Sequence, residues 1–134
     1  MFYYRKSESE GERAFVIRTD FPVYFLSMKH IHIQGFKEAL EANTSNDTVV
    51  FIDVRTPAEH AETRIPGVQN MPLDELAAHA NELKEKKAIY VHCKSGVRSQ
   101  QAVEALESLG VATELINVDG GILAWEQAGY PTAK

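Results

Sequence analysis

The feature that most constrains the fold of this chain is a set of short, nearly continuous apolar runs. Residues 49–54 and 88–92 are almost entirely apolar, and residues 114–118 form a further strand-sized run. Such runs are typical of parallel strands that are buried on both faces of a sheet. The segments between them place apolar residues at helical spacing, so strands and helices alternate along the chain. This alternation predicts an α/β domain with a central, mostly parallel sheet and helices on both faces.

Capping and turn residues indicate where other elements begin and end. Thr56 can cap a helix whose first position suits Pro57, and Glu59 can bond back to that cap. Gly110 is expected to end a later helix. We further expect strands at residues 30–33 and near Asn70, and helices at residues 36–42, 73–83, 99–109 and 120–129.

The first 28 residues differ from the rest of the chain. Their acidic and basic side chains cancel, and residues 14–19 and 22–26 look like short strands. These strands would form an added hairpin or pack on a partner chain. Alternatively, Met28 is the true start of the protein. We therefore divide the chain into an N-terminal extension, residues 1–28, and a domain, residues 29–134.

Length, charge and cysteine content exclude several classes of function. A chain of 134 residues suits one domain with its own hydrophobic core. Its net charge of -5 argues against a nucleic-acid partner, which would require a basic face. It has one cysteine and hence no intrachain disulfide, which fits a reducing compartment. No apolar run reaches the length of a membrane span and no secretory signal is visible, so we expect a cytoplasmic protein without a membrane partner.

The segment most informative about function surrounds that one cysteine, Cys93. It begins at the carboxyl end of a buried strand and leads directly into a helix. Ligands bind at this edge of parallel sheets, and the first amides of a helix stabilise anions. Gly96 allows the backbone to curl so that several amides converge, and Lys94 and Arg98 add positive charge. The pattern predicts an anion-stabilising site at Cys93.

This segment, residues 93–99, is called the cysteine loop below, and it can activate Cys93 as a nucleophile. The thiolate is the reactive form, and a free cysteine with a pKa of about 8.5 is only slightly ionised at neutral pH. Helix N-termini and nearby cations lower that pKa to roughly 3.5–7.5. A lone cysteine is often just a small buried residue. The loop nevertheless favours catalysis or anion binding, and we expect Cys93 to be an exposed, ionised nucleophile.

The loop sequence His-Cys-Lys-Ser-Gly-Val-Arg-Ser, residues 92–99, resembles the active-site loop of single-domain rhodaneses. Further matches over residues 29–131 are Phe-Ile-Asp-Val-Arg (51–55), Ile-Pro-Gly-Val (65–68), Met-Pro-Leu (71–73) and Gly-Gly-Ile-Leu-Ala-Trp (120–125). The resemblance implies a rhodanese-like three-layer fold and a sulfurtransferase without a cofactor. Its cysteine would take a sulfane sulfur from a small anionic donor such as thiosulfate. The persulfide would then pass that sulfur to a thiol, cyanide or an acceptor protein.

The resemblance also implies roles for individual residues. Cys93 would carry the sulfur, Arg98 would orient the anionic donor, and Lys94 would help attract it. Backbone amides of the loop would hold the outer sulfur of the persulfide. Because the chain has no second cysteine, an external acceptor must resolve this persulfide. The predicted substrate-binding residues are Lys94, Ser95, Gly96, Val97, Arg98 and Ser99.

Asp53 and Arg55 end a central strand near the predicted site. They would hold the cysteine loop in place, as the resemblance suggests, or form a charge pair or cap at the strand end, and both interpretations stay open. The family often has Gly-His before Ile-Pro-Gly, whereas this chain has Thr63-Arg64. We therefore expect a different turn there, with no effect on the chemistry.

The remaining candidate residues are interpreted as structural. Strand alternation points His92 away from Cys93 and into packing. Trp125 lies at helical spacing from Ile122, which is typical of the core. The five histidines show no spacing suited to metal ligands, so we expect no metal.

Two rival functions remain. A cysteine phosphatase that shares this fold places five residues between cysteine and arginine, whereas four separate Cys93 from Arg98. An arginine at the phosphatase spacing would fall at position 99, which is serine. The shorter loop makes a tighter amide ring, better suited to one sulfur than to a phosphoryl group. A non-catalytic protein-binding module is the second rival, and it is disfavoured because the cysteine and both loop cations are present.

Overall fold

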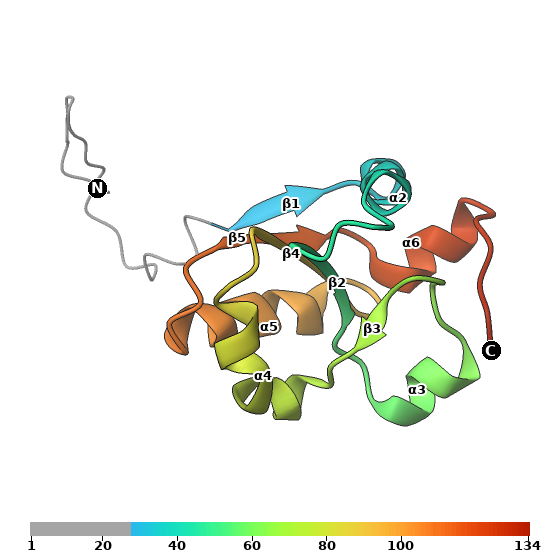
Figure 1. The fold of residues 1–134 in the computed structure, drawn as a ribbon. Coiled ribbons are helices and arrows are strands. Elements are labelled where there is room, and N and C mark those ends of the chain that lie inside the picture. Colours follow the sequence, from blue (N-terminus) through green and yellow to red (C-terminus); the bar gives the residue numbers. More distant parts are fainter. Residues whose placement is uncertain (1–27) are drawn as a thin grey trace, which may run out of the picture.

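The domain is built on a sheet of five strands, seen in the computed structural model, which describes residues 28–134. All neighbouring strands in it are parallel, in the spatial order β1-β5-β4-β2-β3 (Figure 1). The strands are β1 (Lys29–Ile31), β2 (Val49–Asp53), β3 (Gln69–Asn70), β4 (Ala88–His92) and β5 (Glu114–Val118).

The central position of β4, between β2 and β5, explains the apolar runs. Side chains on a central strand are covered on both faces, and both Ile52 and Ile89 are fully buried. The last residues of β2 and β4, Asp53 and His92, are paired in register. The carboxyl ends of these two strands therefore lie side by side, and Cys93 follows immediately.

Helices cover both faces of the sheet (Figure 1). They are α2 (Ile33–Ala42), α3 (Pro57–Glu62), the 3-10 helix η1 (Leu73–Glu75), α4 (Leu76–Leu83), α5 (Val97–Ser108) and α6 (Gly121–Gln127). Helices α4 and α5 bury Leu83 and Leu106 in a core on one face. Helices α2 and α6 bury Phe36 and Trp125 in a second core on the other face. The predicted three-layer α/β architecture is confirmed.

The predicted bounds differ from the structure at two helix starts. The strand expected at residues 30–33 ends at Ile31, and α2 already begins at Ile33, where Ile33 packs against the second core. His32 is the residue before the helix, and its carbonyl accepts from the Phe36 amide at 2.9 Å. Similarly, α5 begins two residues before the predicted position 99, because the turn that precedes it is complete at Gly96.

The two strands predicted at residues 14–19 and 22–26 lie outside the described residues, and the division into 1–28 and 29–134 stays a prediction. Met28 is described, and it packs partly buried against the first core.

The turn at Thr63-Arg64, which differs in sequence from the family pattern, contacts the C-terminal segment: Arg64 forms an isolated antiparallel bridge with Ala133. Among residues 28–134, no helix has both the length and the apolar character to cross a bilayer.

Candidate active site

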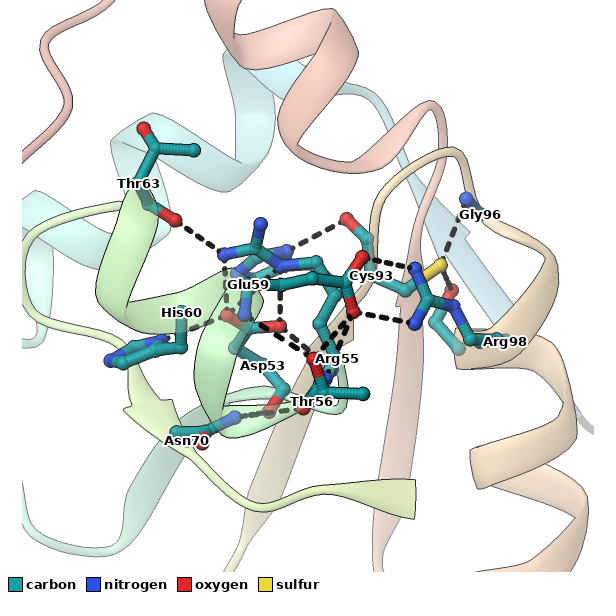
Figure 2. Close-up of polar contacts among 12 residues, drawn as sticks. Asp53, Arg55, Thr56, Glu59, His60, Thr63, Asn70, Cys93, Gly96 and Arg98 are labelled. Atoms are coloured by element: carbon teal, nitrogen blue, oxygen red, sulfur yellow. Dashed lines mark hydrogen bonds and ion pairs between the residues drawn. The ribbon is translucent and has the colours of Figure 1, made fainter.

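Cys93 directly follows β4 and lies at the carboxyl edge of the sheet. Between it and α5, Gly96 adopts a φ of 109°, in the left-handed region that favours glycine. A Cβ at this position would also lie 3.4 Å from the backbone nitrogen of Gly120. The Gly96 amide donates to Cys93 Sγ at 3.0 Å (Figure 2). The glycine turn thus directs a main-chain donor at the sulfur.

Several hydrogen bonds from the cysteine loop favour the thiolate of Cys93. Burial by itself raises the pKa of this thiol. Hydrogen bonds with the Ser99 side chain and with the amides of Ser99, Gly96 and Ser95 outweigh burial, so the pKa of Cys93 lies below its usual value. The loop therefore stabilises the charged form through the Ser99 hydroxyl and main-chain amides rather than through a neighbouring base.

The expectation that Cys93 is exposed is wrong, since its exposed fraction is only 1%. The physical reason is the geometry of the loop itself. A backbone that curls to aim amides at a sulfur atom must also wrap around it. The outer surface of the loop is formed instead by the exposed residues Lys94, Ser95 and Val97. Val97 is 63% exposed.

Helix α6 fixes the other side of the cysteine loop. The Ile122 amide donates to the Cys93 carbonyl at 2.9 Å, and the Leu123 amide donates to the Lys94 carbonyl at 3.1 Å. This contact requires Gly121, because a Cβ there would lie 2.4 Å from the Cys93 carbonyl oxygen. With these carbonyls bound by α6, the loop amides are left to face the sulfur. The pair Gly120-Gly121 was the sequence signal of this close approach.

Ser99 connects Cys93 to a buried polar residue of β5. The Cys93 thiol lies 3.4 Å from Ser99 Oγ, and the Ser99 hydroxyl donates to Asn117 Oδ1. Asn117 Nδ2 donates to Asp119 Oδ1 at 3.0 Å, which orients the amide oxygen toward Ser99. At this distance the Ser99 hydroxyl is close enough to donate to an ionised Cys93. Sequence reasoning missed Asn117, although an asparagine within the apolar run 114–118 was a signal.

Arg98 forms a bidentate ion pair with Glu59 of α3 (Figure 2). Its NH1 lies 2.8 Å from Glu59 Oε1, and its NH2 lies 3.0 Å from Oε2. The pKa of Arg98 is raised, mainly by this hydrogen bond and further by the nearby Cys93 thiolate. Arg98 thus brings positive charge to the rim, as expected, and Glu59 offsets that charge. Glu59 escaped notice because its spacing from Thr56 already explained it as a helix cap.

Asp53 and Arg55 form a second ion pair that is almost completely buried. Arg55 NH2 lies 2.7 Å from Asp53 Oδ2 and 2.7 Å from the Thr63 carbonyl oxygen. His60 Nδ1 lies 2.8 Å from the same Asp53 oxygen. Burial raises the pKa of Asp53, but the hydrogen bonds with Arg55 and His60 outweigh burial, so the pKa lies below its ordinary value. These contacts reach α3 and the turn after it, so the pair positions the helix that carries Glu59 rather than the cysteine loop directly.

The residues interpreted as structural lie where expected. His92 is fully buried, and its Nδ1 lies 3.0 Å from the Cys93 carbonyl oxygen. Burial lowers the pKa of His92, so the imidazole stays neutral. Trp125 is 3% exposed and belongs to the second core. Within the described part of the chain, no group of three or more His, Cys, Asp or Glu side chains is arranged to hold a metal ion.

The fold and the site define a class of protein: a parallel α/β domain with a thiolate-stabilising loop at the carboxyl end of a central strand. The family model of the rhodanese-like domain matches residues 36–128 of this chain. The chain belongs to the rhodanese-like domain family. The resemblance of the cysteine loop is thereby confirmed at the level of the family.

Individual relatives extend this comparison. The chain is 32% identical to the putative sulfurtransferase YtwF of Bacillus subtilis over 106 residues, which are 79% of this chain and 98% of that protein. It is 35% identical to the putative sulfur carrier protein YrkF of the same organism over 99 residues, 74% of this chain and 51% of that one. The chain thus spans about half the length of some curated relatives that it matches. A rhodanese-like domain protein from Staphylococcus aureus superposes with a TM-score of 0.61 at 35% identity, covering 73% of this chain and 91% of that one.

Proposed function

We propose that this chain is a sulfurtransferase in which Cys93 carries a sulfane sulfur as a persulfide. The observation that carries the proposal is the Gly96 amide 3.0 Å from Cys93 Sγ, in a loop whose hydrogen bonds lower the pKa of that thiol. Two of the relatives described above are named as a putative sulfurtransferase and a putative sulfur carrier, which supports the same chemistry.

The first half-reaction needs no acid or base. The Cys93 thiolate attacks the terminal sulfur of the donor and forms a new S–S bond. The old S–S bond breaks, and its electron pair leaves with the donor; thiosulfate thus leaves as sulfite, which is already a stable anion. The product persulfide carries one negative charge, and the loop amides that face the thiolate are placed to stabilise it.

The second half-reaction requires an acceptor from outside the chain. The sequence contains no second cysteine that could attack the persulfide. A thiol, cyanide or a sulfur-acceptor protein would attack the outer sulfur and release the Cys93 thiolate. A single cysteine also suits a reducing compartment such as the cytoplasm.

The alternative function is a cysteine phosphatase, and the geometry of the cysteine loop disfavours it. Four residues separate Cys93 from Arg98. The Cys93 thiol accepts a hydrogen bond from the Gly96 amide, and Cys93 is only 1% exposed. A phosphoryl group needs room and donors for three equatorial oxygens. A persulfide adds only one sulfur atom.

The direct test is intact-mass analysis of the protein after incubation with thiosulfate. We expect a mass gain of one sulfur atom that localises to Cys93 and is removed by cyanide or by a reductant. Cys93→Ser should show no gain while unfolding at a similar denaturant concentration. Absence of an adduct with every sulfane donor, together with hydrolysis of an aryl phosphate that depends on Cys93, would replace the sulfurtransferase with the phosphatase.

A further inference from the structure

The rim of the site contains a charge pair that the sulfurtransferase chemistry does not require. Both terminal nitrogens of Arg98, the residue expected to bind an anionic donor, are directed at the carboxylate of Glu59. This bidentate geometry is one in which a guanidinium also recognises an oxyanion. Glu59 therefore occupies the same face of Arg98 that a donor anion would use.

Glu59 is held in that position from its own helix. Its Oε1 accepts from the Thr56 amide at 3.0 Å and from Thr56 Oγ1 at 3.1 Å, while its amide donates to Thr56 Oγ1 at 3.2 Å. The Arg98 hydrogen bond lowers the pKa of Glu59 to about 2, against a smaller effect of burial. The carboxylate thus stays charged at neutral pH, and Thr56 and Arg98 hold it in place.

The charges around the mouth of the site then nearly cancel. Glu59 offsets Arg98, and the remaining cation of the loop, Lys94, is exposed to solvent, where its field is screened. The nucleophile itself is an anion. Coulomb energy scales with the charge of the donor, so the carboxylate and the thiolate repel a dianion about twice as strongly as a donor with one negative charge.

We propose that Glu59 is a specificity-determining residue that disfavours doubly charged sulfur donors relative to donors that carry one negative charge or none. This inference rests on the proposed sulfurtransferase function and deepens it. It assigns thiosulfate, a dianion, to the poorer class of donors. Singly charged donors such as thiosulfonates, or persulfides borne on a thiol, form the better class.

Both classes support the same balanced step. With thiosulfate, the Cys93 thiolate takes the terminal sulfur and sulfite leaves with the electron pair of the broken S–S bond. With methanethiosulfonate, the thiolate takes the terminal sulfur in the same way and methanesulfinate leaves. The two donors differ by one unit of charge at the group that faces Arg98 and Glu59, which makes them a matched pair of probes.

The test measures kcat/KM for each donor, with cyanide as the acceptor, in the full chain and in Glu59→Gln. Glutamine keeps the side-chain oxygen that bonds Thr56, so the helix cap is retained while the charge is removed. Because the logarithm of the effect scales with donor charge, we expect kcat/KM to rise about tenfold for thiosulfate and about threefold for methanethiosulfonate. The control is Glu62→Gln, the same charge change at an exposed residue of α3, which should alter both values less than about twofold.

The possible outcomes separate the inference from the function on which it rests. A lower kcat/KM for thiosulfate in Glu59→Gln would mean that Glu59 positions Arg98 for the donor, and the inference would be overturned. Equal changes for the two donors, or changes matched by Glu62→Gln, would overturn it as well. If the unaltered protein gains no sulfur from either donor, the proposed function itself fails.

Discussion

Two arginine–carboxylate pairs lie at the same edge of the sheet, and they differ in burial. Arg55 and Asp53 are 3% and 0% exposed, whereas the side chains of Arg98 and Glu59 are 34% and 31% exposed. Both pairs have short contacts, with closest N–O distances of 2.7 Å and 2.8 Å. Geometry alone would not tell them apart.

The difference in exposure assigns the two pairs different tasks. A buried ion pair cannot lose one partner without leaving an uncompensated charge in the interior, so Arg55 and Asp53 are fixed components of the fold. A half-exposed pair exchanges partners with water and ions at small cost. The pair of Arg98 and Glu59 can therefore open, as the proposed binding of an anionic donor requires, whereas Arg55 stays bound to Asp53.

The largest effect is expected from breaking the buried pair. Arg55→Ala leaves Asp53 buried with His60 as its remaining side-chain partner and removes the bond to the Thr63 carbonyl. The free energy of unfolding should fall by about 3–5 kcal/mol. Urea unfolding at neutral pH measures this change.

The matched control replaces both members of this pair. Asp53→Asn combined with Arg55→Met removes both charges, and this variant should be more stable than Arg55→Ala alone. If Arg55→Ala lowers the free energy of unfolding by less than about 1 kcal/mol, the buried pair contributes no more than a surface pair. The two pairs would then not differ in their contribution to stability.

Breaking the rim pair should affect activity more than stability. Arg98→Ala should change the free energy of unfolding by less than about 1 kcal/mol. It should lower kcat/KM for thiosulfate by about tenfold to a hundredfold, because a hydrogen bond to a charged group contributes about 1.5–3 kcal/mol. Arg98→Lys keeps the charge but not the planar fork, and it should give an intermediate value. Unchanged thiosulfate kinetics in Arg98→Ala would rule out the role of Arg98 in binding the donor.

The smallest effect is expected on the stability of Glu59→Gln at acidic pH. The folded-state pKa of Glu59, about 2, lies below its ordinary value of 4.5, so its carboxylate contributes stability above pH 4.5 that is lost as the pH falls toward 2. The stability difference between the unaltered protein and Glu59→Gln should therefore shrink over this range. Urea unfolding of both proteins at several pH values measures this difference.

The acid experiment also separates the two pairs. The pKa of Asp53 is lowered as well, so Glu59→Gln should keep the part of the acid sensitivity that Asp53 causes. A variant with no remaining loss of stability between pH 4.5 and 2 would contradict the assignment of Asp53 to a charged, buried pair.

The sequence was sufficient for features that depend on local pattern. The strands at residues 88–92 and 114–118 were predicted with the same bounds that the structure has, because short apolar runs between helical patterns are typical of buried strands. The cap of α3 by Thr56 and Glu59 was also predicted, since it involves neighbours in the chain. Gly96 was expected to curl the cysteine loop, and it does so with a positive φ.

Features that join distant segments were not predictable in the same way. Glu59 and Arg98 are 39 positions apart, and Ser99 and Asn117 are 18 apart. No spacing rule connects such residues, because their contact depends on how α3, α5 and β5 meet at the sheet edge. The burial of Cys93 was missed for a related reason: the sequence shows that amides can converge on the sulfur, but not how closely the loop wraps it.

The central claim is that the hydrogen bonds of the cysteine loop lower the pKa of Cys93, and a pH titration of this thiol tests it most directly. Thiolate absorbance in the ultraviolet reports on Cys93 alone, because the chain has no other cysteine and Cys93→Ser supplies the tyrosine background. The account predicts a pKa for Cys93 below its ordinary value of 9.0. A pKa at or above 9.0 would show that burial outweighs the amides and would contradict the account.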